Sequence, residues 1–113
     1  MTAEEIEQIE ISNQEAKKAI EKGEALKRLL ENPDYKLIIA EGFMQEYPKE
    51  LGLAIAGNTG AYDTDALVEL LKGINTIVGY TFQVASNHMA AEQTIRDNEE
   101  YIAQQTAEVK SEE

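Results

Sequence analysis

The sequence contains no cysteine and only one histidine, and this scarcity excludes several kinds of chemistry. Without cysteine there is no disulfide, no thiolate metal ligand and no cysteine nucleophile. With His88 as the one histidine, a nucleophile and base pair is hard to assemble. The sequence also lacks a Gly-x-Ser-x-Gly motif, a His-Glu-x-x-His motif and a lysine-bearing phosphate loop. We therefore predict a protein that is not an enzyme and has no cofactor.

Basic residues and long apolar runs are scarce as well. The 113-residue chain has 10 Lys and Arg against 22 Asp and Glu, a net charge of −12. This charge repels phosphates and anionic lipid head groups, so direct binding of nucleic acid or of a membrane surface is disfavoured. No run approaches about 18 apolar residues, and the acidic start does not resemble a signal peptide. We expect neither a membrane span nor secretion through a signal peptide.

Prolines are few, which favours helices over most of the chain. Residues 1–11 hold four glutamates among three isoleucines without a settled period, and we predict a flexible or extended acidic arm there. The sequence Ser12-Asn13-Gln14-Glu15 matches a capping box, which predicts that a helix begins at this point. Apolar residues at three- and four-residue steps then predict a helix over about 13–31.

Proline and glycine divide the next segment. Asn32-Pro33 is expected to end the first helix and to cap a second one, because proline disfavours α geometry before it but suits a first helical turn. Pro48 is predicted to end that helix and to begin a short one over 49–56, closed by Gly57 in a left-handed conformation. Residues 57–63 are predicted to form a loop, with Asp63 or Thr64 as the next N-cap.

The rest of the chain has no proline, and residues 64–108 are predicted to form one helix of about 45 residues, roughly 67 Å long. Its apolar residues repeat every seven positions, which is typical of a helix that packs in a left-handed pair. A companion row follows four residues after the first. The first row is Leu67, Ile74, Thr81, His88, Ile95, Ile102 and Val109, and the companion row is Leu71, Val78 and Ala85.

These segments predict an all-α fold, an antiparallel helical hairpin in which the long helix packs against two or three shorter, bent helices. Residues 12–109 would form a single domain, and residues 110–113 a C-terminal tail. The shorter helices cannot surround a helix of this length, so part of its apolar side is expected to meet another protein or a second copy. The predicted interface residues are Leu67, Leu70, Leu71, Ile74, Ile77 and Val78, with Tyr62 as a possible anchor at the hairpin tip.

Two further features allow a functional and an ordinary interpretation. His88 and Glu92 lie one helical turn apart, but a metal site needs more than two ligands, so we predict a partly buried, hydrogen-bonded seam histidine and no metal site. Gly73 and Gly79 each cost about 1 kcal/mol in a helix relative to alanine. They indicate either the close approach of another backbone or simple tolerance.

The segment from Ala25 to Lys36, ALKRLLENPDYK, resembles a set of small, largely uncharacterised tailed-bacteriophage proteins, and the likeness continues through Ile38-Ile39, Glu41-Gly42-Phe43 and Glu46. It covers about residues 14–105 and includes a leucine-rich first helix and a long second helix with an acidic end. The resemblance implies a phage accessory or structural protein, in the virion or the host cytoplasm, with no catalytic residues. Tyr47-Pro48 departs from the pattern, which affects where the second helix ends.

We therefore expect a non-enzymatic structural or interaction protein, a homo- or hetero-oligomer that docks on phage structural proteins or on itself through its apolar seam. The alternative is an acidic inhibitor that mimics nucleic-acid phosphates and occupies the site of a host enzyme. A scaffold that leaves the finished particle is a third possibility.

Overall fold

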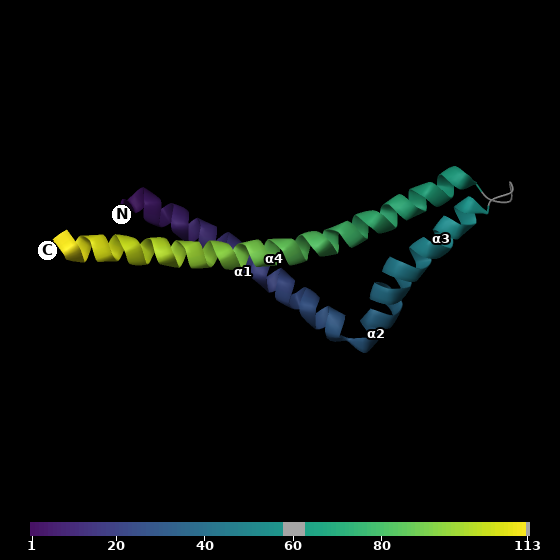
Figure 1. Ribbon diagram of the computed structural model, residues 1–113, viewed down its shortest axis with the longest axis horizontal. Coiled ribbons are helices and arrows are strands. Elements are labelled where there is room, and N and C mark those ends of the chain that lie inside the picture. Colours follow the sequence, from purple (N-terminus) through teal and green to yellow (C-terminus); the bar gives the residue numbers. More distant parts are fainter. Residues whose placement is uncertain (58–62, 113) are drawn as a thin grey trace. The chain divides into compact units, whose positions relative to one another are not determined.

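The computed structural model describes residues 1–57 and 63–112, and these residues contain helices and no strand. The elements are α1 (Ala3–Glu31), the single turn α2 (Pro33–Tyr35), the π-helical η1 (Lys36–Glu46), α3 (Tyr47–Ala56) and α4 (Thr64–Glu112), as Figure 1 shows. The all-α class is confirmed, as is a long C-terminal helix that packs against shorter ones.

Contacts between residues divide the chain into two compact units. Unit 1 contains residues 1–24 and 84–113, and unit 2 contains residues 25–83. Helix α1 therefore contributes its first part to unit 1 and its end to unit 2, whereas α4 begins in unit 2 and ends in unit 1. The assignment of residues 12–109 to one domain stays a prediction.

Helix α1 begins ten residues earlier than the sequence analysis predicted. It starts at Ala3, so residues 3–11 of the predicted arm are helical rather than extended. The cap is a capping box at Thr2 and Glu5: the Glu5 amide donates to Thr2 Oγ1 at 3.1 Å, and the Thr2 amide donates to Glu5 Oε2 at 3.3 Å. The capping box predicted at Ser12 is wrong, because Ser12 lies inside the helix.

In unit 1, α1 and α4 run antiparallel. Asn98 Nδ2 donates to Asn13 Oδ1 at 2.8 Å and to Ser12 Oγ at 3.3 Å, and Gly23 lies against the side chain of His88. As residue numbers rise along α1 from Ser12 to Gly23, the residues that they contact on α4 fall in number from Asn98 to His88. This pairing confirms the hairpin direction of the two helices within unit 1.

In unit 2, the break after α1 follows the prediction. Asn32 has extended backbone angles (φ −73°, ψ 118°), and its Oδ1 accepts hydrogen bonds from the amides of Asp34 at 3.0 Å and Tyr35 at 3.1 Å. Pro33 occupies the first turn, where its missing N–H costs nothing.

The next segment, η1, is a wide π-helix where the sequence analysis predicted an α-helix over the residues up to Pro48. At its end the Tyr47 amide donates to the carbonyl of Gly42, five residues back. In α geometry the ring of Pro48 would press on the carbonyl of Met44, and the wider turn before the proline relieves that overlap. Phe43 and Tyr47 stack with ring centroids 6.2 Å apart.

Helix α3 carries Pro48 in its first turn, as predicted, and ends at Ala56. Gly57 is not left-handed as predicted: its φ is −93° and its amide donates to the carbonyl of Leu53 at 2.9 Å. Asp63 caps α4, since its Oδ1 accepts from the Asp65 amide at 3.0 Å. At the other end α4 continues to Glu112, so the tail predicted from residue 110 is mostly helical.

The core of the described residues is small. Four apolar residues are buried, two in each unit: Ala16 and Ala91 in unit 1, and Leu51 and Ile74 in unit 2. Two of these four are alanines, which remove little apolar surface from water. Packing within each unit therefore leaves many large apolar side chains at the surface.

Candidate protein interaction surface

The predicted seven-residue row is the side of α4 that its own chain covers. Ile74 is 4% exposed, and Leu67 and Thr81 are half-buried in unit 2. In unit 1 His88 is buried, Ile95 and Ile102 are half-buried, and only Val109 at the end of the row is exposed. Most members of the row therefore pack inside their own unit.

The companion row changes position along the helix. In unit 2 it lies four residues after the first row, where Leu71 and Val78 are half-buried. In unit 1 the covered residues lie three positions after each member of the first row instead of four. Ala85, the last member of the predicted companion row, is therefore exposed, and a different set of residues is covered. That set is Val84, Ala91, Asn98 and Gln105. The sequence analysis missed it because two of its members are polar amides.

The predicted interface residues separate into three groups. Leu70 is 50% exposed and Ile77 is 45% exposed, so both are accessible in unit 2. Leu67, Leu71 and Val78 are half-buried. Ile74 belongs to the core of unit 2 and is not available to a partner. Tyr62 lies outside the described residues.

A second row of α4 was recognised only in part by the sequence analysis, through Leu70 and Ile77. The row consists of five exposed residues that follow each other along α4 at steps of four, three, four and three: Ala66, Leu70, Gly73, Ile77 and Tyr80. We call these five residues the free stripe. It lies about a quarter-turn around the helix from the covered row. Its spacing could have been read from the sequence, but alanine and glycine hide the pattern because they add little hydropathy.

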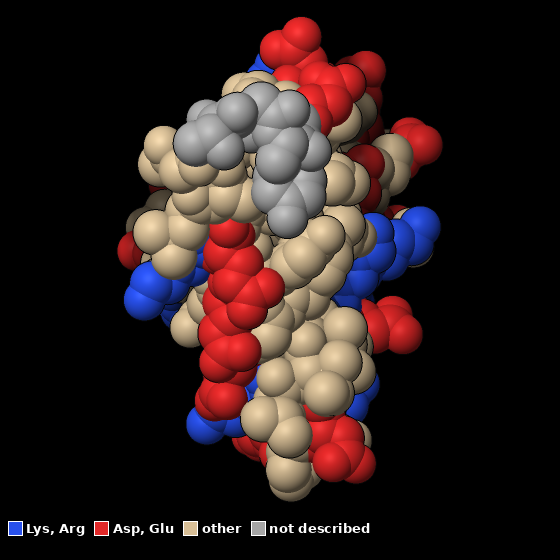
Figure 2. All heavy atoms as spheres, turned by 90° about the vertical axis from the view of Figure 1, so that its right-hand side faces the viewer, with Lys and Arg blue, Asp and Glu red and all other residues tan. Residues whose placement is uncertain are grey.

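In Figure 2 the residues other than Lys, Arg, Asp and Glu, polar and apolar alike, form a broad tan area beside a column of acidic ones. Other large apolar side chains of unit 2 are also exposed. They come from the end of α1, from η1, from α3 and from α4. The members are Leu29, Leu30, Leu37, Ile38, Tyr47, Leu53 and Phe82. Apolar surface on this scale is typical of a protein that contacts other proteins.

Among the described residues, no other backbone lies against the two internal glycines of α4. A Cβ atom built on Gly73 or on Gly79 would have no neighbour within 4 Å. Of the two predicted explanations, close approach by another backbone is not observed within the described part of this chain, and simple tolerance agrees with the open space. Gly23 in unit 1 is the reverse case, because a Cβ there would overlap the Nδ1, Cγ and Cβ atoms of His88.

His88 is 5% exposed, which is more deeply buried than the sequence analysis predicted. Its Nε2 lies 2.7 Å from Glu92 Oε1 on the next turn, yet this contact lacks the alignment of a hydrogen bond. His88 thus lies buried on the seam, as predicted, but the predicted hydrogen bond is replaced by a close contact with the Glu92 carboxylate. In the described part of the chain, no three acidic or histidine side chains group as metal ligands would.

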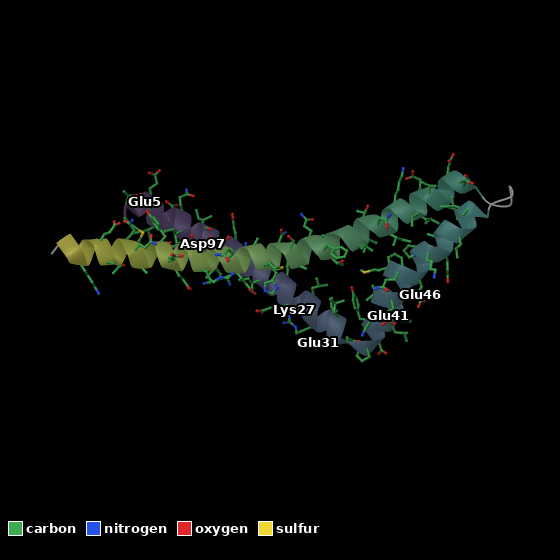
Figure 3. The ribbon with its side chains drawn as sticks, viewed as in Figure 1. Glu5, Lys27, Glu31, Glu41, Glu46 and Asp97 are labelled. Atoms are coloured by element: carbon green, nitrogen blue, oxygen red, sulfur yellow. The ribbon has the colours of Figure 1, made fainter. Side chains whose placement is uncertain are left out.

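Charge differs between the units. Unit 1 has 14 acidic and 5 basic side chains, a net charge of −9, whereas unit 2 has 8 and 5, a net charge of −3. Figure 3 labels Glu5 and Asp97 in unit 1 and Glu41 and Glu46 on η1 of unit 2. Most of the negative charge therefore belongs to the unit that exposes fewer large apolar side chains.

Comparison of this chain with family models, with curated proteins and with solved structures found no match. None of the helices in the described ranges is both long and apolar enough to cross a membrane.

Proposed function

We propose that this protein is a non-enzymatic interaction or structural protein that docks on other proteins through the exposed side of α4 in unit 2 that carries Leu70 and Ile77. The observation that carries the proposal is the exposure of Leu70 and Ile77 on α4, beside the half-buried Leu67, Leu71 and Val78. Covering such side chains with a partner removes apolar surface from water, which is the main favourable contribution to most protein association.

The resemblance of residues 14–105 to small tailed-bacteriophage proteins supports a more specific role, that of a virion or assembly accessory protein. In this role the partner is a phage structural protein, and the protein carries out no catalysis. The lack of cysteine and the burial of the one histidine agree with a role without chemistry.

The experiment is a binding assay on purified virion components with variants of exposed residues. The variant Leu70→Ser with Ile77→Ser should lose binding, because it removes apolar contact area from the centre of the surface. The control Phe82→Ser changes a side chain of the same helix that is 71% exposed on a different side, and it should bind as the native chain does. Binding by neither the native chain nor the control, with native helicity retained, contradicts the proposal.

The second candidate, an acidic inhibitor that mimics nucleic acid, is favoured by the net charge of −9 on unit 1. Its binding would weaken steeply as salt rises, because exposed charges farther apart than about 8–10 Å are screened at physiological ionic strength. Partner binding that is equal in low and high salt, and that depends on Leu70 and Ile77, rejects this candidate in favour of the first.

A further inference from the structure

The free stripe has the spacing of a second helix-packing seam. Ala66, Leu70, Gly73, Ile77 and Tyr80 follow each other at steps of four, three, four and three, the pattern by which one helix inserts side chains between those of another. All five are exposed in unit 2, and the space beside Gly73 is open. The described part of the chain thus leaves this seam without a partner helix.

We propose that a second copy of this chain covers the free stripe, with the two α4 helices antiparallel about a two-fold axis near Asn75 and Thr76. This inference rests on the proposed function and names the partner of the same surface. In an antiparallel seam, each position of one row faces a position of the other row. Leu70 then faces the partner's Tyr80, and Gly73 faces the partner's Ile77.

These layers are complementary in size. The open space at Gly73 accommodates the side chain of the partner's Ile77, and the two-fold axis repeats the contact with the roles exchanged. Leu70 and Tyr80 form the outer layers in the same way. Each layer is apolar, and the one glycine faces a large side chain rather than a second glycine.

The charges beside the stripe also permit a second copy. The flanking positions on the open side are Glu69, Thr76 and Gln83. Under the same two-fold axis Glu69 faces the partner's Gln83 and Thr76 faces the partner's Thr76, so no carboxylate meets another carboxylate. Residues 64–83 have a net charge of −1, since Lys72 partly offsets Asp65 and Glu69. The net charge of −12 on each chain is therefore largely remote in sequence from this seam.

The length of the contact sets the expected strength. Residues 70–80 span about 16 Å of helix, and a contact one helix wide over that length buries less than the roughly 1,000 Å² that a stable interface needs. We therefore expect a reversible dimer whose population rises with protein concentration.

Cross-linking tests the proposal, because the chain has no cysteine of its own. Thr76→Cys places a thiol beside the two-fold axis, and a short bis-maleimide should link two such chains about tenfold faster than it links Phe82→Cys chains, which meet only by collision. Orientation is tested with Glu69→Cys and Gln83→Cys. Each should link slowly with itself, because identical positions lie about 21 Å apart along the axis, and rapidly when the two variants are mixed.

Light scattering provides a second measurement that needs no cross-link. Ile77→Glu should remain monomeric at concentrations where the native chain dimerises, whereas Phe82→Glu, which adds the same charge on a different side of the helix, should dimerise as the native chain does. Circular dichroism of both variants confirms that the helices are retained.

If Thr76→Cys chains and Phe82→Cys chains cross-link at equal rates, a second copy does not cover the free stripe. Self-linking of Glu69→Cys as fast as its linking to Gln83→Cys overturns the antiparallel arrangement. Suppose that no self-linking occurs, but the native chain binds virion components and the double variant Leu70→Ser with Ile77→Ser does not. The second copy is then wrong as the partner, and the proposed function stands. If those components do not bind either, both are wrong.

Discussion

In unit 1 the two helices approach each other through small residues, whereas in unit 2 large apolar side chains remain at the surface. Ala16, Gly23 and Ala91 are buried in unit 1, and His88 and Asn98 place polar groups on the same seam. In unit 2, Leu51 and Ile74 are buried while Leu37, Ile38 and Leu53 are among the most exposed apolar residues.

This difference separates two roles of helix packing. The polar contacts of unit 1 fix the register of α1 against α4, since a shifted pairing would leave Asn98 without Ser12 and Asn13. Unit 2 has no such contact between distant residues among its described hydrogen bonds, and it holds the apolar surface instead. Unit 1 thus holds the contacts that set one alignment, and unit 2 holds the exposed apolar side chains through which we propose that a partner binds.

The largest effect is expected from two alanine substitutions that contrast the units. Gly23→Ala should lower the free energy of unfolding by about 2 kcal/mol, because the new Cβ overlaps the buried ring of His88. Gly73→Ala should raise it by up to about 1 kcal/mol, because alanine favours the helix and its Cβ meets open space.

Urea denaturation followed by circular dichroism at low protein concentration measures both changes. The double variant Gly23→Ala with His88→Ala should lose less stability than the two single changes added together, because His88→Ala removes the ring atoms that the new Cβ at residue 23 overlaps and leaves only the contact with the Cβ of residue 88. Equal effects of Gly23→Ala and Gly73→Ala would remove the contrast between the units.

A smaller effect is expected at the polar contact of unit 1. Asn98→Ala removes two hydrogen bonds at a half-buried site and should cost about 1–2 kcal/mol. The control Gln104→Ala changes an exposed amide on the same helix and should stay within about 0.5 kcal/mol. Thermal unfolding compares the stability of the two variants. If Asn98→Ala does not lower stability, other contacts set the register of α1 against α4.

The helix caps are expected to contribute about 1 kcal/mol each. Asp63→Ala removes the acceptor for the Asp65 amide at the start of α4, in unit 2, and Thr2→Ala removes the acceptor for the Glu5 amide in unit 1. The Thr2 change should act mainly on the first turns of α1, because that cap lies at the chain end. Hydrogen exchange of amides in each unit distinguishes a local loss of protection from a global one.

The smallest effect is expected from salt. Raising the ionic strength should slow amide exchange in unit 1 more than in unit 2, because screening weakens repulsion within a unit of net charge −9 more than within one of −3. Hydrogen exchange at low and high salt measures the difference. A larger gain in unit 2 would mean that salting-out of its apolar side chains outweighs charge.

Local signals predicted much of the secondary structure. The side chains of Asn32 and Asp63 cap helices, and the ring of Pro33 suits the first turn that follows Asn32. The absence of proline after Pro48 allows α4 to continue unbroken from Thr64. The start of α1 was missed because the capping-box pattern occurs twice in the sequence, at Thr2 and at Ser12, and only the pattern at Thr2 caps the helix. The π-helical turns of η1 could not be predicted, because they depend on how the chain accommodates the proline that follows.

The exposure of apolar side chains on α4 was predicted in part, and their contact with a partner stays a prediction. Leu70 and Ile77 were identified and are exposed, but Ile74 is buried, and Gly73 and Tyr80 were not recognised as members of the free stripe. A helical period shows that residues share one side of a helix, but it does not show whether that side faces its own chain. Which of two neighbouring apolar rows is covered depends on the helix that packs against it.

The sequence by itself determined that this protein is helical, where Asn32 and Asp63 cap its helices, that α4 is long and that the chain is strongly acidic, because these follow from backbone chemistry and composition. Only the tertiary structure decided which side of α4 is covered, that Gly23 receives the ring of His88, and that Asn98 meets Ser12 and Asn13. Those outcomes join residues far apart in the chain, and the physical reason is that packing selects among faces that local propensity leaves equivalent.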